Sequence, residues 1–311
     1  MTTPTNRRTF LRSTLGVAGL PFLVSRAHAQ GASGTIASTS LGDDLFLLTG
    51  AGANVVARTS PDGLVLVDGG LAERAADLAK AVATLPGAKP VRTLFNTHWH
   101  PEQTGSNLTL RRAGATVVAH ENTRLWLTTD VTWPWDGRTF QPAPKEALPN
   151  QTFYGMSYEN DTLTIDGERI EYGYLLQAHT DGDLYVFFPK ANVLAIGDVI
   201  SGAGWPFIDW RTGGWINGIV SGLETLLKVA NDKTRVVASQ GPLLTRADLE
   251  AQHKMFTAIA QRLRAIMFGG KNIEDAIAEQ PTKEYNDRMG DPKQFIRLAF
   301  QSMWAHFTPD A

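Results

Sequence analysis

Two histidines, His98 and His100, stand two residues apart just after the apolar run Val91–Phe95. The run predicts a buried strand, and the histidines then fall on the loop at its end. Such loops are held by the sheet and open to solvent, so they are where a fold of this kind places reactive side chains. Two imidazoles at this spacing supply half of a metal site. The pattern therefore predicts a sheet-based fold with a metal-binding edge.

Composition limits the possible number of domains, the classes of partner and the types of metal ligand. The chain has 311 residues, 43% of them apolar and 19% charged, which is enough to bury a sizeable core in one large domain or two small ones. The net charge of -2 indicates neither nucleic acid nor an anionic membrane as a partner. There is no cysteine, which excludes disulfides, thiolate ligands and a cysteine nucleophile. Histidine and carboxylate side chains remain as the candidate metal ligands.

The first 29 residues predict an export signal of the twin-arginine kind. Arg7 and Arg8 precede the apolar stretch 13–24, and the small residues Ala27 and Ala29 mark a cleavage site before Gln30. The apolar stretch is too short for an ordinary membrane anchor. We therefore expect the twin-arginine machinery as a partner, a periplasmic or secreted bacterial location, and a mature form without membrane attachment. Removing four arginines and no acids would leave that form with a net charge near -6.

The rest of the chain predicts an α+β fold. Strand-like runs occur in both halves, at 44–49, 54–58, 64–67, 91–95, 116–119, 162–165, 168–172, 175–177, 185–188, 193–196 and 236–238. Helical spacing predicts helices near 71–85, 105–114 and 218–230, from Thr245 and from Asp291. Residues 130–161 are rich in Pro, Trp, Asn and Gly and predict a long loop. We expect two stacked sheets with helices outside and no linker within the mature chain.

Polar residues follow several of these strands. His179 lies in Ala178-His179-Thr180-Asp181-Gly182-Asp183, Asp198 ends the strand 193–196, Asp68 ends the strand 64–67, and Ser239-Gln240-Gly241 ends the strand 236–238. Together with the first histidine pair, these residues form one set of candidates for a site at the strand ends. Asp68, before two glycines, is expected to support the metal loops rather than to bind metal.

On the basis of these residues, the chain resembles the metallo-β-lactamase superfamily over about residues 35–265. The family pattern is His-x-His-x-Asp-His, then a lone His, a bridging Asp and a final His. The matching residues are His98, His100, His179 and Asp198. The resemblance implies an αββα four-layer sandwich over residues 30–311 with a C-terminal helical extension, and these four residues as metal ligands.

Three positions depart from the family pattern: Glu102 replaces the Asp, Gln103 replaces the third His, and Gln240 replaces the final His. The resemblance assigns those positions to the second metal, so we expect one tightly bound ion. Three neutral imidazoles with an open fourth position suit Zn²⁺, which lowers the pKa of a bound water to about 7; Fe and Mn are alternatives. An amide oxygen is a poorer zinc ligand than imidazole.

The remaining candidates have assigned roles. Asp198 is expected to orient the water or to bind the metal, and Glu102 to act as general base, unless it only complements a helix dipole. Substrate contacts are expected from Gln103, Gln240, Trp99, Trp205 and Phe207. The tryptophans concentrated in two loops, Trp133, Trp135, Trp205, Trp210 and Trp215, either wall a site for an apolar or ring-bearing small molecule or only pack the loops.

Three functions follow from these expectations. The first is hydrolysis of an ester, lactone or amide bond, a β-lactam included, by metal-activated water. The second is a mononuclear iron dioxygenase of the persulfide type, since oxygen-activating iron sites use histidines and a carboxylate. The third is a degenerate member that binds a ligand without turnover, because three of the seven ligand positions have changed.

Overall fold

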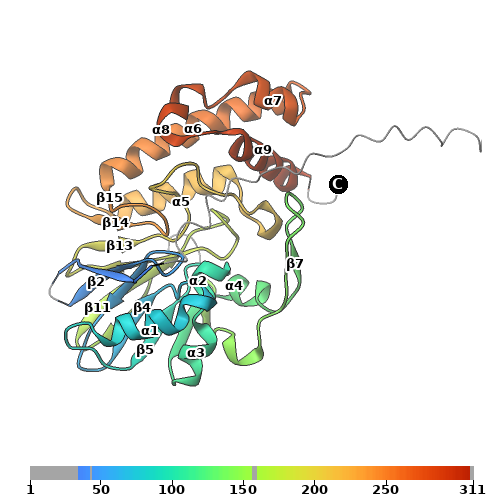
Figure 1. The fold of residues 1–311 in the computed structure, drawn as a ribbon. Coiled ribbons are helices and arrows are strands. Elements are labelled where there is room, and N and C mark those ends of the chain that lie inside the picture. The colour runs from blue at the N-terminus through green and yellow to red at the C-terminus, as the bar shows by residue number, and fades with distance from the viewer. Residues whose placement is uncertain (1–33, 43, 156–159, 309–311) are drawn as a thin grey trace, which may run out of the picture.

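Residues 34–42, 44–155 and 160–308 are described by the computed structural model (Figure 1). The predicted export signal, residues 1–29, lies outside these residues, and its assignment stays a prediction. Within the described part of the chain, no helix is both long enough and apolar enough to cross a bilayer.

The first sheet has seven strands in the order β1-β2-β3-β4-β5-β6-β9. Their bounds are β1 Ala37–Ser40, β2 Leu45–Thr49, β3 Val55–Arg58, β4 Leu64–Val67, β5 Val91–Phe95, β6 Thr116–His120 and β9 Gln151–Phe153. Strands β1 to β4 form an antiparallel meander, whereas β4, β5, β6 and β9 run parallel. The parallel strands are joined by helical crossovers, so their carboxyl ends lie at one edge of the sheet.

The second sheet has six strands in the order β10-β11-β12-β13-β14-β15. Their bounds are β10 Asn160–Ile165, β11 Glu168–Tyr174, β12 Leu184–Phe188, β13 Val193–Ala195, β14 Arg235–Val237 and β15 Leu244–Thr245. Only β13 and β14 pair in parallel. Because β11 and β13 are both antiparallel to β12, they end at the same edge of this sheet.

Helices cover both outer faces, as Figure 1 shows. Helices α1 Ala75–Ala83 and α3 Asn107–Arg112 cover the first sheet. The second sheet is covered by α5 Ile216–Val229, α6 Arg246–Phe268, α7 Ile273–Glu279, the short α8 Asn286–Met289 and α9 Lys293–Phe307. One apolar core lies between the sheets, around Phe95 and Phe188, and each outer face has its own core against its helices. The α+β fold class and the αββα sandwich are confirmed.

The helix expected at 105–114 is α3, and a separate short helix, α2 Pro101–Thr104, precedes it, because Pro101 fits the first helical position and can start a helix. Two local predictions are wrong. Residues 175–177 form a turn in which Gln177 has a φ of 49°. The expected loop 130–161 contains a hairpin, β7 Val131–Thr132 and β8 Thr139–Phe140, and the edge strand β9. Strands this short leave no periodic signal in the sequence.

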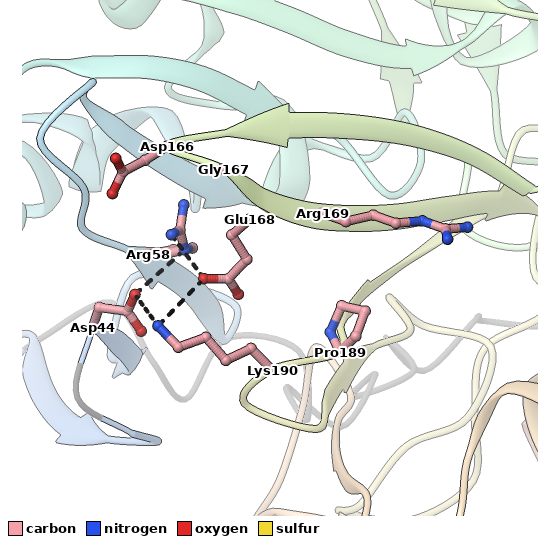
Figure 2. A pocket seen from close by; sticks show the side chains of 8 residues that line it. All are labelled: Asp44, Arg58, Asp166, Gly167, Glu168, Arg169, Pro189 and Lys190. Carbon is pink, nitrogen blue, oxygen red and sulfur yellow. Dashed lines mark hydrogen bonds and ion pairs between the residues drawn. The ribbon is translucent and has the colours of Figure 1, made fainter.

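A buried ion-pair network joins the two sheets away from the histidines (Figure 2). The Arg58 guanidinium on β3 donates to Glu168 Oε2 on β11 at 2.8 Å and lies 3.5 Å from Asp44 Oδ2. The Lys190 ammonium lies 3.8 Å from both carboxylates. The Arg58 side chain is only 3% exposed, so its charge depends on these partners.

We predict that Glu168→Ala lowers the free energy of unfolding by about 3 kcal/mol, because it leaves a buried guanidinium with an incomplete set of partners. Urea unfolding measures the loss. Glu146→Ala is the matched control, since it removes a carboxylate from an exposed pair with Arg112 and should have little effect. Equal losses in the two variants would contradict a structural role for the network.

His120 ends β6, lies at the N-cap of the next helix and is only 4% exposed. Its ring stacks on Tyr174 at 4.0 Å, and its Nδ1 accepts from Asn122 N at the start of α4 Glu121–Trp126. Burial lowers the pKa of His120 from 6.5 to about 4, against a smaller opposing effect of Glu121. Between pH 6.5 and about 4, the ring is therefore neutral in the folded protein and protonated in the unfolded chain.

We predict that part of the wild-type stability is present above pH 6.5 and is lost as the pH falls from 6.5 towards 4, because the unfolded chain then binds the extra proton. In His120→Asn, which keeps an acceptor for the helix cap, this part of the pH dependence should disappear. Urea midpoints measured from pH 7 to pH 4 test the difference. Parallel curves for the two proteins would show that His120 is not responsible.

Candidate metal centre

His98, His100, His179 and Asp198 converge at one edge of the sandwich. The first two lie between β5 and α2, His179 lies in the loop after β11, and Asp198 follows β13. One potential ligand atom from each lies within 4.8 Å of the others. The three histidines are almost completely buried, and the Asp198 side chain is 22% exposed. Residues far apart in sequence thus form one cluster that solvent reaches at its carboxylate.

The outward nitrogen of each ring has a hydrogen-bond partner. His98 Nδ1 lies 3.2 Å from Thr97 Oγ1, whose own hydroxyl donates to Asp68 Oδ2 at 3.0 Å. His100 Nε2 lies 3.0 Å from Asp209 Oδ2, and His179 Nδ1 lies 2.7 Å from the Phe207 carbonyl oxygen. Each partner is best placed to accept, so each outward nitrogen carries the proton.

These protons leave lone pairs on the inward nitrogens. His98 Nε2 is buried, has no hydrogen-bond partner among the described residues, and lies 3.5 Å from Asp198 Oδ2. His100 Nδ1 and His179 Nε2 are 3.2 Å apart, close to the roughly 3.3 Å between two nitrogens on one tetrahedral zinc ion. Burial, followed by the charges of His100 and His179, lowers the pKa of His98 well below 6.5 and keeps its ring neutral. The donor set fits a metal ion.

Close backbone approach fixes the ligand loops. At Gly197, where φ is 59°, a Cβ atom would lie 2.7 Å from Thr97 Oγ1, so a side chain would disturb the group that holds His98. At Gly214 a Cβ atom would lie 2.0 Å from the His179 carbonyl oxygen. Glycine is therefore required at both positions.

The His179 turn is held by a second buried carboxylate, Asp183. It accepts from Thr180 N at 2.8 Å, from Thr180 Oγ1 at 2.9 Å and from His179 N. Burial raises the pKa of Asp183 well above 3.8, and these donors oppose that shift. Asp68 plays a comparable part under the first loop, where it also accepts from Thr97 N at 2.8 Å. The supporting position expected for Asp68 agrees with this contact.

Amides occupy the second metal position of the family pattern. Gln103 Nε2 donates to Asp198 Oδ2 at 3.3 Å and to Ser239 Oγ at 3.1 Å, and Gln240 Nε2 donates to the Gly52 carbonyl at 3.0 Å. Glu102, on the first turn of α2, is partly exposed. Burial raises the pKa of Asp198 to about 6, with His100 opposing and Glu102 adding to the shift.

The aromatic residues that were expected to contact a substrate lie in different surroundings. Phe207 is partly exposed, with its ring 5.9 Å from His179 and 6.1 Å from His100. Trp99 is 3% exposed and packs beneath His100, so it supports that ring and offers almost no surface to a substrate. Trp205 stacks on Phe295 of α9 and donates to the Gly290 carbonyl, which places its ring against the C-terminal helices.

Of the other four loop tryptophans, Trp133 and Trp135 lie close to Phe207, with ring distances of 5.0 and 5.1 Å. Trp215 stacks on His306 of α9, and Trp210 is 6.0 Å from Trp135. The wall beside the histidines is therefore made by the β7–β8 hairpin and Phe207. The remaining tryptophans pack loops onto the sandwich.

Sequence reasoning missed Asp209, which is fully buried and contacts His100. Its only signal was an acid placed between apolar and aromatic residues, Ile208 and Trp210. That pattern does not identify a contact 109 residues away in sequence. Asp183 was quoted with the segment that carries His179, but the sequence assigned it no role.

A family model described as the metallo-beta-lactamase superfamily matches residues 48–241. The chain belongs to this superfamily, and its hydrolase-type fold carries a His/Asp cluster that could hold a metal ion.

Solved structures support the fold. A metallo-beta-lactamase from Pontibacter korlensis is 19% identical with a TM-score of 0.55, and the match covers 71% of this chain and 99% of that one. The stereoselective inverting sec-alkylsulfatase Pisa1 from Pseudomonas sp. is 16% identical with a TM-score of 0.65, covering 89% of this chain and 51% of that one. The DIM-1 metallo-beta-lactamase is 16% identical with a TM-score of 0.55, covering 72% and 98%. This chain thus spans about half the length of the alkylsulfatase, and identities this low establish the fold alone.

Proposed function

We propose that the protein is a metal-dependent hydrolase that uses metal-activated water on an ester, lactone or amide bond, β-lactams included. The observation that carries this proposal is the orientation of three buried imidazoles, each with its outward nitrogen hydrogen-bonded and its inward nitrogen directed at a common point. The three imidazoles would hold a Lewis-acidic ion there, with Zn²⁺ preferred over Fe or Mn for this donor set, which would supply polarisation of the scissile group and a water of lowered pKa.

The protein residues divide the remaining work. His98, His100 and His179 would hold the ion, and Asp198 would join them or orient the attacking water. Glu102 accepts the proton, since it is partly exposed on α2 and close enough to Asp198 to influence its pKa. Phe207 and Trp135 contribute an apolar surface that favours a substrate with a ring or an alkyl group.

One ion, not two, is proposed for this centre. The amide nitrogen of Gln103 already faces Asp198, and a donor N–H cannot bind a cation. Gln240 directs its amide nitrogen at the Gly52 carbonyl. The hydrogen bond from Gln103 to Asp198 Oδ2 stabilises the charge of Asp198, which in the family pattern bridges two ions.

The substrate panel should contain esters, lactones and β-lactams. An alkyl sulfate belongs in it as well, because the structure of an alkylsulfatase matches 89% of this chain. Oxygen uptake with a persulfide and bound iron would favour the dioxygenase alternative. Ligand binding without turnover of any panel member would favour the degenerate alternative.

We predict that His98→Ala lowers hydrolysis of the best panel substrate by at least about 100-fold, because a three-ligand site loses one ligand. Removal of metal with a chelator should have the same effect on the wild type, and added Zn²⁺ should reverse it. The matched control is His253→Ala, since His253 lies on α6 beside Glu224, outside the cluster. Activity that survives both His98→Ala and metal removal would contradict the proposal.

We also propose that the protein is exported folded by the twin-arginine route and acts in the periplasm or outside the cell. The support is the sequence of residues 1–29, in which Arg7 and Arg8 precede an apolar stretch and a small-residue cleavage site.

Replacing Arg7 and Arg8 together by Lys should retain the protein inside the cytoplasm, because the twin-arginine signal is then lost. Fractionation of cells expressing each protein measures the result. Arg26→Lys, which changes an arginine of the same segment outside the pair, should leave export unchanged. Equal export of all three forms would contradict this route.

A further inference from the structure

Asp209 is a fully buried carboxylate beside the candidate metal centre. Its Oδ2 faces two donors, His100 Nε2 at 3.0 Å and Trp133 Nε1 at 3.2 Å. Its Oδ1 accepts from Thr212 N at 3.3 Å and caps the 3₁₀ helix Trp210–Thr212. One side chain therefore connects a metal-ligand ring, the β7–β8 hairpin and the following helical turn.

The backbone around Asp209 also contacts the third ligand loop. Asp209 N donates to the His179 carbonyl at 3.0 Å, and the Phe207 carbonyl lies 2.7 Å from His179 Nδ1. The segment 207–209 thus contacts His100 through a side chain and His179 through the main chain. Its position determines how two of the three rings face the centre.

Trp133 links the same carboxylate to the aromatic wall. It is 6% exposed, and its ring lies 5.2 Å from the His100 ring and 5.0 Å from the Phe207 ring. Its indole N–H is therefore placed by the oxygen that also places His100.

We propose that Asp209 is a positioning residue that holds His100 with Nδ1 towards the ion and, through the same oxygen, seats Trp133 in the wall beside Phe207. This inference rests on the proposed function, because it concerns the ligand set of the same ion. It predicts that the orientation of a metal ligand and the shape of the substrate wall depend on one carboxylate.

An amide cannot accept all three side-chain hydrogen bonds of Asp209 at once. Asp209 accepts hydrogen bonds on both oxygens, whereas the nitrogen of an asparagine side chain is only a donor. In Asp209→Asn, that nitrogen must face either Thr212 N or the pair of donors from His100 and Trp133. If the amide nitrogen faces His100 and Trp133, His100 Nε2 has to accept a hydrogen bond. The ring proton then moves to Nδ1, the atom whose lone pair should bind the metal. Outer partners of this kind typically change metal affinity by 10–100-fold.

The experiment measures zinc affinity of purified full-length protein by competition with a chromophoric chelator. Asp209→Asn should bind Zn²⁺ about 10–100-fold more weakly than the wild type. Trp133→Phe removes the indole donor and part of the ring but keeps the contact between Asp209 and His100, so its affinity should stay within about threefold of the wild type, which isolates the contribution of His100. The control Asp232→Asn changes a carboxylate that is 96% exposed and should bind as the wild type does.

Nuclear magnetic resonance adds readouts that do not depend on turnover. In the zinc-free wild type, the imidazole nitrogens should report His100 protonated on Nε2, and His98 and His179 protonated on Nδ1. The Trp133 indole N–H signal, assigned by its loss in Trp133→Phe, should shift in Asp209→Asn and not in Asp232→Asn. These wild-type measurements test the inference even if Asp209→Asn does not fold.

Unchanged zinc affinity in folded Asp209→Asn, or an Nδ1 proton on His100 in the zinc-free wild type, would overturn the inference. Either result would leave the proposed hydrolase intact, provided that the wild type binds zinc. Failure of the wild type to bind any metal would overturn both.

Discussion

The outward nitrogen of each imidazole in the cluster is hydrogen-bonded to an acceptor that cannot move freely. The acceptors are a hydroxyl backed by Asp68, the carboxylate of Asp209 and the carbonyl of Phe207. A neutral histidine has one N–H and one lone pair, so fixing the outer N–H also fixes the inner lone pair. Because the rings are buried, they cannot turn to water instead. The geometry of the centre therefore follows from its supports.

The same constraint explains several features of the surrounding backbone. Gly197 lets the Asp198 strand end approach Thr97, and Gly214 lets the loop after Asp209 approach His179. The first sheet supplies two of the rings, and the second sheet supplies the third together with the carboxylate. The apolar core between the sheets, with Phe95 and Phe188 fully buried, keeps those contributions in register. Folding and site assembly thus depend on the same packing.

On the other side of Asp198, amides take positions that the family pattern gives to ligands of a second ion. Gln103 and Ser239 form a hydrogen-bonded chain with the carboxylate, and Glu102 lies nearby on α2. These hydrogen bonds satisfy the amide nitrogen of Gln103 without a cation, whereas its buried Oε1 has no hydrogen-bond partner among the described residues. The protein therefore differs from the family pattern in the side chains at the second metal position, while the fold is the same.

Local patterns in the sequence were sufficient to predict the sandwich, most strands and the helices from Thr245 and Asp291, because apolar periodicity and the Thr245–Asp248 capping box are encoded within a few residues. The resemblance to the family, rather than a local pattern, predicted which four residues converge. Neither predicted Asp209, the β7–β8 hairpin or the burial of Trp99. Those features depend on contacts between distant segments, for which spacing along the chain carries no signal. The separate substrate roles expected for Gln103, Gln240 and Trp205 remain predictions, and the hydrogen bonds of these residues to neighbouring protein groups indicate structural roles as well.

Metal content of protein purified without added metal, set against protein concentration, decides whether the cluster holds a single ion. The expected value is about one transition-metal ion per chain, held by the three imidazoles and lost in His98→Ala. A value near two would show that Gln103 and Gln240 do not exclude a second ion. A value near zero that added Zn²⁺ does not raise would contradict the metal centre itself.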